Sequence, residues 1–380
     1  MKSIDELRNE IDKIDDELSA LYTARMEICK QIGLQKANSG KAVNVSDREK
    51  AIVNRITADK PDEMKRYLKL LYDTVFFQSK NYQGKFVQTK SETVEQLNAI
   101  LSGERKDFPV SATVACQGVS GAYSAVAADK LFDISNITFF KTFEGVFTAV
   151  DKGLCEYGVL PIENSNAGSV SQVYDLMKKH NFYIVKSVRV QISHALCAQK
   201  GVKLSEIKTV YSHSQALMQC AEYLKNLGVK TIEVENTAVA AKMVAESDDK
   251  TIAAICSGDC ADIYNLCVLE RAVQDNGNNF TRFICISKTL KVFKGADKIS
   301  VMTSLANKPG SLNRMLSRFS AIGLNLTKLE SRPIANSQFE FMFYFDFDGD
   351  ITSPDVLNLL GELENSSDKF VFLGSYKEII

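Results

Sequence analysis

The chain has 380 residues, and its 46 basic and 47 acidic side chains nearly cancel to a formal net charge of −1. One hydrophobic core rarely serves more than about 250 to 300 residues, so we expect two or three domains. The balanced charge, without a long run of either sign, argues against a nucleic-acid or membrane-surface partner and favours a small molecule.

The sequence also lacks the patterns of a membrane span, a secretory signal and a metal site. No stretch approaches the roughly 18 apolar residues of a membrane helix, and the start MKSIDELRNE has no apolar signal core, so we expect a cytoplasmic protein. The nine cysteines show no CxxC spacing and there are three histidines. We therefore expect neither a disulfide scaffold nor a bound metal or cofactor.

From Ile4 onward, apolar residues recur at alternating steps of three and four, which predicts one long amphipathic helix. A helix that ends at Lys36 is about 50 Å long at 1.5 Å per residue, too long for a small first domain to cover, so a second chain is expected along it. Two more helices are predicted, one from Ser46 or Asp47 and one from about Pro61 to Gln83.

The pattern changes twice after these helices. Residues 84–108 are polar and patternless and predict a linker with one short helix. From Val110 to about residue 290, short apolar runs alternate with Gly- and Ser-rich turns and helical stretches, as in α/β units. From Lys298 the order is strand, helix, strand, strand, helix, strand, the ferredoxin-like pattern. We expect a multidomain fold with an all-helical domain (1–90), a linker (91–108), an α/β domain of two subdomains (109–290) and an α+β domain (296–380).

Charged residues interrupt the apolar seam of the first helix. Arg25 stands where the spacing demands an apolar side chain, and Arg8 and Lys36 flank the same face. An unpaired buried charge costs several kcal/mol, so we expect an anion there, either a ligand or a protein carboxylate such as Glu49. In the third helix Tyr72, Phe76, Ser79 and Gln83 follow at steps of four, three and four, which adds polar groups to one cavity.

The segments LRNEIDKIDDELSALYTARMEICKQIGLQK, VSDRE and SKNYQ resemble the all-helical chorismate mutase family over residues 1–85. The resemblance implies substrate carboxylates on Arg8, Arg25 and Arg48, the ether oxygen on Lys36 and Gln83, the substrate hydroxyl on Glu49, and a further polar contact from Ser79. It also implies that Arg8 reaches the site from a second protomer. Val45 departs from the family, in which many members have an acid at this position.

Three turns of the α/β segment carry hydroxyl and amide side chains where a strand gives way to a helix. They are GVSGAYS (118–124), PIENSNAGS (161–169) and YSHSQ (211–215). Helix N-termini bind anions, and open α/β sheets hold ligands at the carboxyl ends of their strands. Ordinary N-capping explains any one turn, but three together favour a ligand site. None has the lysine of a P-loop or fits GxGxxG, so we do not expect a nucleotide.

GVSGAYS, LPIENSNAGSV, VYSHSQAL and NFTRF, in this order, are similar to the prephenate dehydratase family across residues 110–290. The resemblance implies two subdomains that enclose the substrate, with Thr281 as a hydrogen-bond donor to the departing hydroxyl. Glu163 is either a protonated acid or an orienting group. The other implied site residues are Ser120, Asn164, Ser165, Ser212, His213, Gln215, Gln219, Arg282 and Phe283.

The tail contains NKPGSL (307–312) and ESRP (330–333) and looks like the ACT domain that follows phenylalanine-inhibited dehydratases. The resemblance implies an effector site at Gly310, Ser311, Leu312, Glu330, Ser331 and Arg332. Free amides at the Gly310 turn suit a carboxylate, and Glu330 suits an ammonium. In the alternative, Glu330 and Arg332 form a surface ion pair and the tail serves dimerisation alone.

Together these resemblances imply an enzyme that rearranges chorismate to prephenate and converts prephenate to phenylpyruvate, with feedback inhibition by phenylalanine and a homodimer or larger homo-oligomer. One alternative is an arogenate dehydratase, although a mutase that makes prephenate favours prephenate as substrate. A second alternative is a two-lobed solute-binding sensor without catalysis. The lack of a signal peptide and the complete NFTRF motif argue against that reading.

Overall fold

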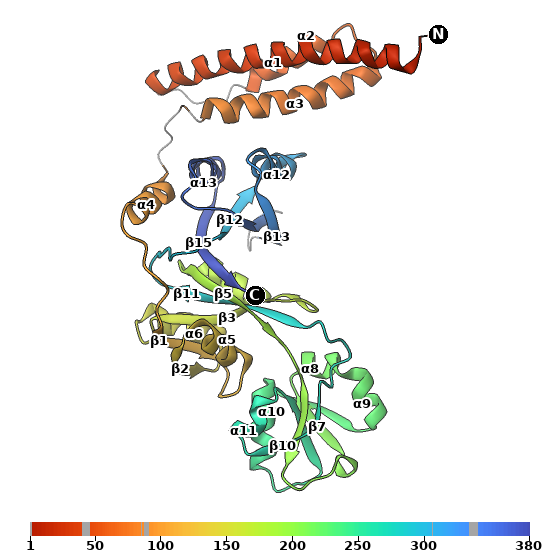
Figure 1. Ribbon diagram of the computed structural model, residues 1–380, viewed down its shortest axis with the longest axis vertical. Helices are drawn as coiled ribbons and strands as arrows, with labels where there is room; N and C mark the ends of the chain where they lie inside the picture. Colours follow the sequence, from red (N-terminus) through yellow and green to blue (C-terminus); the bar gives the residue numbers. More distant parts are fainter. Residues whose placement is uncertain (1, 40–45, 85, 87–90, 306, 334–340) are drawn as a thin grey trace.

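The computed structural model describes residues 2–39, 46–84, 86, 91–305, 307–333 and 341–380. Figure 1 shows them in successive tiers, with the helices α1, α2 and α3 at one end, a C-terminal unit beneath them, and two α/β lobes at the other end. Within the described residues, no helix is both long enough and apolar enough to cross a membrane.

The first tier is all helical, as predicted. It consists of α1 (Ile4–Ser39), α2 (Ser46–Thr57) and α3 (Asp62–Gly84). In this single chain the apolar seam of α1 stays uncovered over its first half, where Ile4, Leu7, Ile11, Ile14, Leu18 and Leu21 are 46–70% exposed. A soluble helix rarely leaves such a continuous apolar stripe in water.

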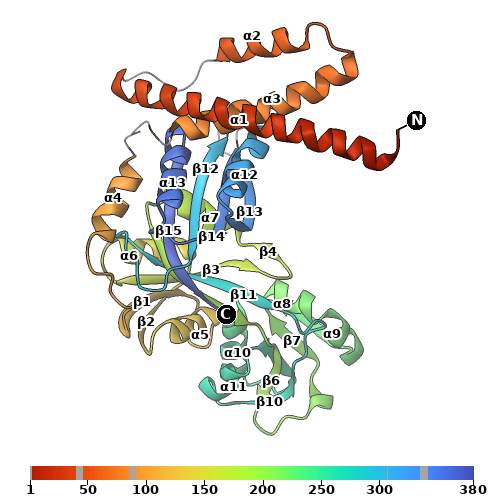
Figure 2. The ribbon, with the colours of Figure 1, turned by 45° about the horizontal axis from the view of Figure 1, so that its top comes forward.

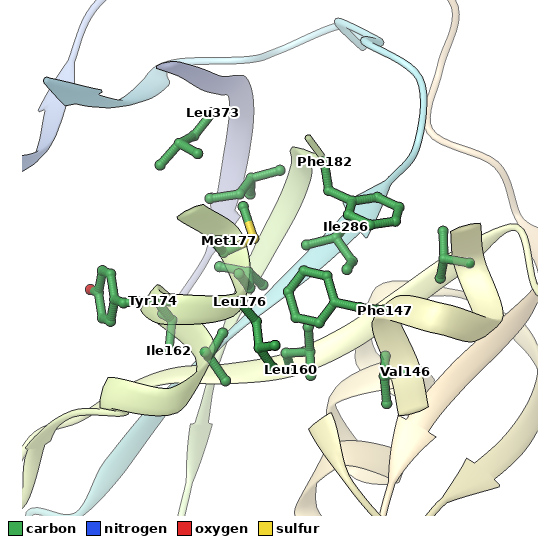
Figure 3. Packing of buried hydrophobic residues seen from close by; sticks show 14 of the residues in the cluster. Val146, Phe147, Leu160, Ile162, Tyr174, Leu176, Met177, Phe182, Ile286 and Leu373 are labelled. Atoms are coloured by element: carbon green, nitrogen blue, oxygen red, sulfur yellow. The ribbon is translucent and has the colours of Figure 1, made fainter. Parts of the chain in front are cut away.

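The upper lobe is built on one end, β5 to β2, of a long sheet whose order is β13-β14-β12-β15-β5-β11-β3-β1-β2, with β4 paired to β3. Its own strands are β1 (Ser111–Gln117), β2 (Ile134–Phe140), β3 (Tyr157–Asn164), β4 (Gly168–Ser169), β5 (Tyr183–Gln191) and β11 (Phe280–Ser287). Its helices are α5 (Tyr123–Leu131), α6 (Phe143–Asp151) and α7 (Ser171–Lys179). Phe147, Leu160 and Met177 meet in the fully buried core between the sheet and α6 and α7 (Figure 3).

The lower lobe has a separate five-stranded sheet of order β10-β6-β9-β7-β8. Its strands are β6 (Ala195–Gln199), β7 (Thr209–Ser212), β8 (Lys230–Glu233), β9 (Ile252–Cys256) and β10 (Leu266–Arg271). Its helices are α8 (Ser214–Gln219), α9 (Ala221–Leu227), α10 (Thr237–Glu246) and α11 (Asp259–Ile263), with a 3-10 turn at Leu204–Glu206. The chain passes between the lobes twice, from β5 to β6 and from β10 to β11.

The C-terminal unit has the predicted order of strands and helices. It comprises β12 (Lys298–Leu305), α12 (Ser311–Ala321), β13 (Asn325–Pro333), β14 (Phe341–Asp348), α13 (Pro354–Ser366) and β15 (Phe370–Ile379). Its sheet is not separate from the upper lobe, because β15 pairs with β12 and then, in parallel, with β5. Gly374 lies where β15 passes between these two partners. A Cβ there would lie 2.1 Å from the carbonyl oxygen of Ile184, and φ is +147°, so only glycine fits.

The predicted linker contains a helix that belongs structurally to the C-terminal unit. α4 (Glu92–Leu101) begins at the N-cap Ser91, and Ser91 and Thr93 both donate hydrogen bonds to Glu364 at the end of α13. Leu97 is fully buried in the core formed by α12, α13 and their sheet. Figure 1 shows α4 beside α13. This segment is therefore a packed element of the C-terminal unit.

Candidate active sites

The first candidate site is a cavity of about 470 Å³ between the three N-terminal helices. Six residues expected from the sequence line it, namely Arg25, Lys36, Arg48, Glu49, Ser79 and Gln83. Ile28, Ile32, Ile52 and Phe76 form its apolar wall. The described lining contains four cations, including Lys80, against one carboxylate, so the cavity has a positive potential that suits a small polyanion.

Contacts within this cavity bear on the two expectations for Arg25, a ligand anion or a protein carboxylate. Its guanidinium donates to Ser79 Oγ and lies 5.9 Å from the centre of the Phe76 ring. Glu49 forms an ion pair with Lys80 at 3.0 Å. Among the described contacts the predicted alternative, a protein carboxylate on Arg25, is therefore absent, and the guanidinium faces the cavity.

Lys36 and Gln83 meet at one end of the same cavity. The Lys36 ammonium donates to Gln83 Oε1 at 3.3 Å, which leaves the amide nitrogen of Gln83 as a donor. Arg8 does not reach this cavity in the single chain. It is largely exposed on the first turns of α1 and contacts Asp5 at 3.4 Å. Val45 lies outside the described residues.

The second candidate site is a cleft of about 450 Å³ between the upper and lower lobes. The upper lobe contributes Asn164 from the end of β3 and Thr281 and Phe283 from β11. The lower lobe contributes His213, Gln215 and Gln219, which lie at or within the short helix α8. These six residues were expected from the sequence, and the fold brings them to one cavity.

Thr281 and Asn164 are direct partners across two antiparallel strands. Asn164 Nδ2 donates to Thr281 Oγ1 at 2.9 Å. The oxygen of this amide accepts the backbone N–H groups of Asn166 and Ala167 at 3.0 and 2.9 Å. Because Thr281 Oγ1 accepts a bond from Asn164, its own proton remains available to a group in the cleft.

Two expected residues lie on the other face of these strands. Glu163 precedes Asn164 and Arg282 follows Thr281, and successive side chains of a strand point to opposite faces. They therefore face the C-terminal unit, where they line a separate cavity of about 410 Å³. As direct contacts for a ligand in the cleft, Glu163 and Arg282 are corrections to the sequence-based expectation.

Arg282 is the centre of a buried charge cluster in that interface. Its guanidinium contacts Asp346 of β14 and lies 2.8 Å from Glu378 of β15, with the hydroxyl of Tyr376 alongside. Glu163 forms an ion pair with Lys328 of β13 at 2.8 Å. These ion pairs hold β3 and β11 against the C-terminal unit, because removing one partner leaves the other charge buried without compensation.

Three expected serines also lie outside the cleft lining. Ser212 is fully buried and donates to the carbonyl of Ile255 at 2.6 Å, a structural bond within the lower lobe. Ser165 lines the interface cavity and accepts the backbone N–H of Phe280 at 3.0 Å. Ser120 has an exposed side chain. These three serines do not line the cleft in this structure, and their expected contacts with a substrate stay a prediction.

Several cleft residues were not singled out from the sequence. They are Gln117, Tyr123, Ser124, His194, Glu235, Asn236 and Thr237. Asn236 caps α10 by accepting the N–H of Val239 at 2.8 Å, and an Asn before an Ala-rich helical run was a readable signal. Tyr123 donates to the carbonyl of Ser193 at 2.7 Å, and burial raises its pKa. His194 adjoins the β5–β6 crossing, and burial lowers its pKa.

The expected effector residues fall into two groups in the C-terminal unit. Gly310 has φ +79° and opens α12, with the Arg314 guanidinium donating to Ser311 Oγ at 3.0 Å, while Leu312 packs against the core of the unit. Glu330 accepts from Ser169 at 2.9 Å, and Arg332 donates to Ser171 at 2.7 Å. Ser331, which lies between Glu330 and Arg332 in β13, is exposed.

The two ESRP contacts cross to the upper lobe, because Ser169 lies in β4 and Ser171 in α7. The ion pair between Glu330 and Arg332 expected in the alternative is present at 4.0 Å. It is accompanied by these bonds, so the ESRP strand is joined to the segment that follows Asn164. Among the described residues, no three His, Cys, Asp or Glu side chains cluster as metal ligands would.

Two family models match the chain in the positions of these two sites. The chorismate mutase type II model matches residues 7–84, and the prephenate dehydratase model matches residues 114–291. A bifunctional chorismate mutase/prephenate dehydratase of Aquifex aeolicus (strain VF5) is 33% identical over 384 residues, covering 100% of this chain and 99% of the relative. Arogenate dehydratase 2 of Petunia hybrida is 38% identical and covers 69% of this chain and 71% of the relative.

Among solved structures, the prephenate dehydratase of Arthrobacter aurescens in complex with L-Phe resembles this fold. It is 30% identical with a TM-score of 0.64, and the match covers 70% of this chain and 89% of that chain.

Proposed function

The chain belongs to the family of bifunctional chorismate mutase/prephenate dehydratases, and we propose that its helical cavity and its cleft catalyse two consecutive steps, chorismate to prephenate and prephenate to phenylpyruvate. The two chemistries are assigned to separate sites. The observation that carries the assignment is that matched residues converge on two cavities, one with a cationic lining and one with neutral hydroxyl and amide groups.

The helical cavity suits a pericyclic rearrangement. This reaction needs no nucleophile or acid, only a compact substrate conformer and stabilisation of negative charge that builds on the ether oxygen. Arg25 and Arg48 supply cations for the two substrate carboxylates, and Glu49 supplies an acceptor for the substrate hydroxyl. Lys36 and the amide nitrogen of Gln83, which share one end of the cavity, supply two donors for the ether oxygen.

The cleft suits a decarboxylative elimination. The bond to the ring carboxylate breaks, its electron pair enters the ring, and the ring hydroxyl leaves as aromaticity is gained. The protein need only stabilise the departing hydroxide. Thr281 is our candidate donor, because Asn164 occupies its acceptor side and leaves the hydroxyl proton for the leaving group. Water and carbon dioxide are the by-products, and the proton balance closes through solvent.

We further propose that the C-terminal unit is an ACT-type regulatory domain that binds phenylalanine and inhibits dehydration. Its βαββαβ order and the positions of the Gly310 turn and the ESRP strand support this assignment. The crystallised relative carries L-Phe. The bonds from Glu330 and Arg332 to Ser169 and Ser171 supply a physical link to the chain that holds Asn164. We also propose a homodimer that covers the exposed seam of α1.

An absorbance assay for phenylpyruvate tests the function directly. The full chain is supplied with chorismate, prephenate or arogenate separately, and arogenate turnover is followed as phenylalanine. We expect turnover of chorismate and prephenate, a lower kcat/KM for arogenate, and inhibition of prephenate turnover by added phenylalanine.

Each outcome discriminates between functions. A preference for arogenate would support the function of the Petunia relative, whose match covers 69% of this chain. No turnover of any of the three compounds, with ligand binding retained, would favour the solute-binding sensor instead.

A further inference from the structure

Asn279 is a buried polar residue at the second crossing between the lobes. Its side chain is fully buried, although it belongs to the connection between β10 and β11. Asn279 Oδ1 accepts from Asn164 Nδ2 at 2.8 Å, and Asn279 Nδ2 donates to Gln219 Oε1 at 2.9 Å. Asn279 thus joins an upper-lobe residue of the cleft to a lower-lobe residue.

The donors and acceptors in this series of hydrogen bonds follow from the two backbone N–H groups at its start. The N–H groups of Asn166 and Ala167 can only donate, so the side-chain atom of Asn164 that they contact is its oxygen. Asn164 Nδ2 therefore carries the two protons. Its two shortest acceptors are Asn279 Oδ1 at 2.8 Å and Thr281 Oγ1 at 2.9 Å, with the Phe280 carbonyl at 3.2 Å.

The same logic continues into the lower lobe. Gln219 Oε1 accepts from Asn279 and lies 2.9 Å from His194 Nε2, so the proton of this imidazole is on Nε2. His194 Nδ1 has no hydrogen-bond partner among the described residues. Burial lowers the pKa of His194, which keeps the ring neutral near pH 7 and agrees with a single proton.

We propose that Asn279 is a positioning residue for dehydration, which holds the Asn164 amide so that its other N–H meets Thr281 and the threonine proton points into the cleft. Without Asn279, the Asn164 amide turns towards the Phe280 carbonyl and its bond to Thr281 loosens. The inference deepens the proposed function and rests on the role given there to the Thr281 hydroxyl. Because Gln219 is bound to Asn279, the position of the lower lobe is coupled to that alignment.

The experiment is a double-mutant cycle with Asn279→Ala and Thr281→Ala in the full chain, assayed with prephenate. We expect Asn279→Ala to lower kcat about tenfold with KM changed less than about twofold. In the Thr281→Ala background the same substitution should change kcat less than about twofold, because there is no hydroxyl left to position. Asn278→Ala, an exposed neighbour of the same residue type, is the control and should match the unmodified chain.

Several outcomes would overturn the proposal. An equal loss in both backgrounds means that Asn279 has only a structural role, and an unchanged kcat in the single variant means that it has no role. Chorismate turnover and thermal unfolding report folding.

If Asn279→Ala does not fold, Asn279→Asp serves instead, because it keeps the acceptor for Asn164. The Asp variant loses the donor to Gln219 and buries a carboxylate, so we expect part of kcat to be lost, but less than in Thr281→Ala. A loss as deep as that of Thr281→Ala would overturn the proposal. If Thr281→Ala itself keeps full activity, the role proposed for the Thr281 hydroxyl fails, which is a separate result.

Discussion

Thr281 and Asn164, paired on β11 and β3, present a hydroxyl donor to the cleft. The role of this hydroxyl can be tested by removing it alone. Thr281→Ala removes the hydroxyl but keeps the backbone that pairs with Asn164, and it leaves Phe283 in its hydrophobic cluster. We expect prephenate turnover to fall about a hundredfold or more, the usual cost of a lost transition-state hydrogen bond. Chorismate should still be consumed and prephenate should accumulate, which chromatography of the reaction mixture measures.

Arg25 offers the reciprocal test, because its guanidinium faces only the helical cavity. Arg25→Ala should abolish chorismate use while supplied prephenate remains a good substrate. Equal loss of both activities in either variant would contradict two independent sites. Ser171→Ala is not a suitable control for these assays, since Ser171 contacts Arg332. Asn98→Ala, an exposed position on α4, is suitable.

For single residues, the sequence predicted which helix or strand carries a side chain better than it predicted which cavity that side chain faces. The spacing of α1 placed Arg25 on a seam, and the helix periodicity was enough to bring Ser79 and Gln83 to it. Glu163 and Arg282 were expected beside Asn164 and Thr281 because they are adjacent in the motifs. The alternation of a strand sends adjacent side chains to opposite faces, so it separated them. Asn279, within NFTRF, had no periodic signal to reveal its two amide bonds.

At the scale of elements, β3 and β11 act as a two-sided partition. One face presents Asn164 and Thr281 to the cleft, and the other presents Glu163 and Arg282 to the C-terminal unit. A shift of either strand therefore moves both sets of side chains together. This arrangement supplies a short physical route by which the C-terminal unit can influence dehydration.

Glu163→Gln tests this partition. The substitution removes the ion pair with Lys328 but keeps the size of the side chain. We expect unregulated prephenate turnover within about threefold of normal, because Glu163 does not line the cleft, together with weaker inhibition by phenylalanine. The measurements are initial rates over a phenylalanine titration. A hundredfold loss of turnover without phenylalanine would instead restore Glu163 as the catalytic acid.

The helix α4 was underestimated from the sequence, because its polar composition resembles a linker. Val94, Leu97, Ile100 and Leu101 nevertheless repeat at helical spacing and pack on the C-terminal core. Leu97→Ala should lower the unfolding free energy of that unit by about 2–5 kcal/mol, the usual cost of truncating a buried leucine. Calorimetry should show unfolding of the Leu97→Ala variant at a lower temperature, whereas the transition temperature of the Asn98→Ala control should not change. A Leu97→Ala transition that is also unchanged would mean that α4 does not stabilise the unit.

At the scale of the whole molecule, the C-terminal unit lies between the two proposed active sites. Figure 2 shows α12 and α13 of this unit facing the N-terminal helices and β15 running towards the upper lobe. β15 joins the sheet of the unit to β5 of the upper lobe. On the other side of the unit, the Arg318 guanidinium of α12 lies 5.9 Å from the centre of the Phe77 ring of α3. The order of strands and helices was predictable, because each has its own period. The pairing of β15 with β5 was not, since it depends on contacts between residues about 190 positions apart.

The exposed seam of α1 and the place of Arg8 lead to the last prediction, which concerns assembly. Arg8 is exposed and far along α1 from the cavity that Arg25 lines, so in one chain it has no role at that site. If a second chain packs along the seam, each cavity takes Arg25 from one protomer and Arg8 from the other.

Arg8→Ala and Arg25→Ala should then each abolish chorismate turnover as separate proteins. Mixed and allowed to exchange subunits, they should recover up to about a quarter of the normal activity per cavity, because random pairing makes half of the dimers mixed and each mixed dimer has one intact cavity. Prephenate turnover, measured alongside, should stay constant and report protein integrity. Failure to recover, with exchange confirmed by mass spectrometry of differently tagged chains, would place Arg8 outside the active site.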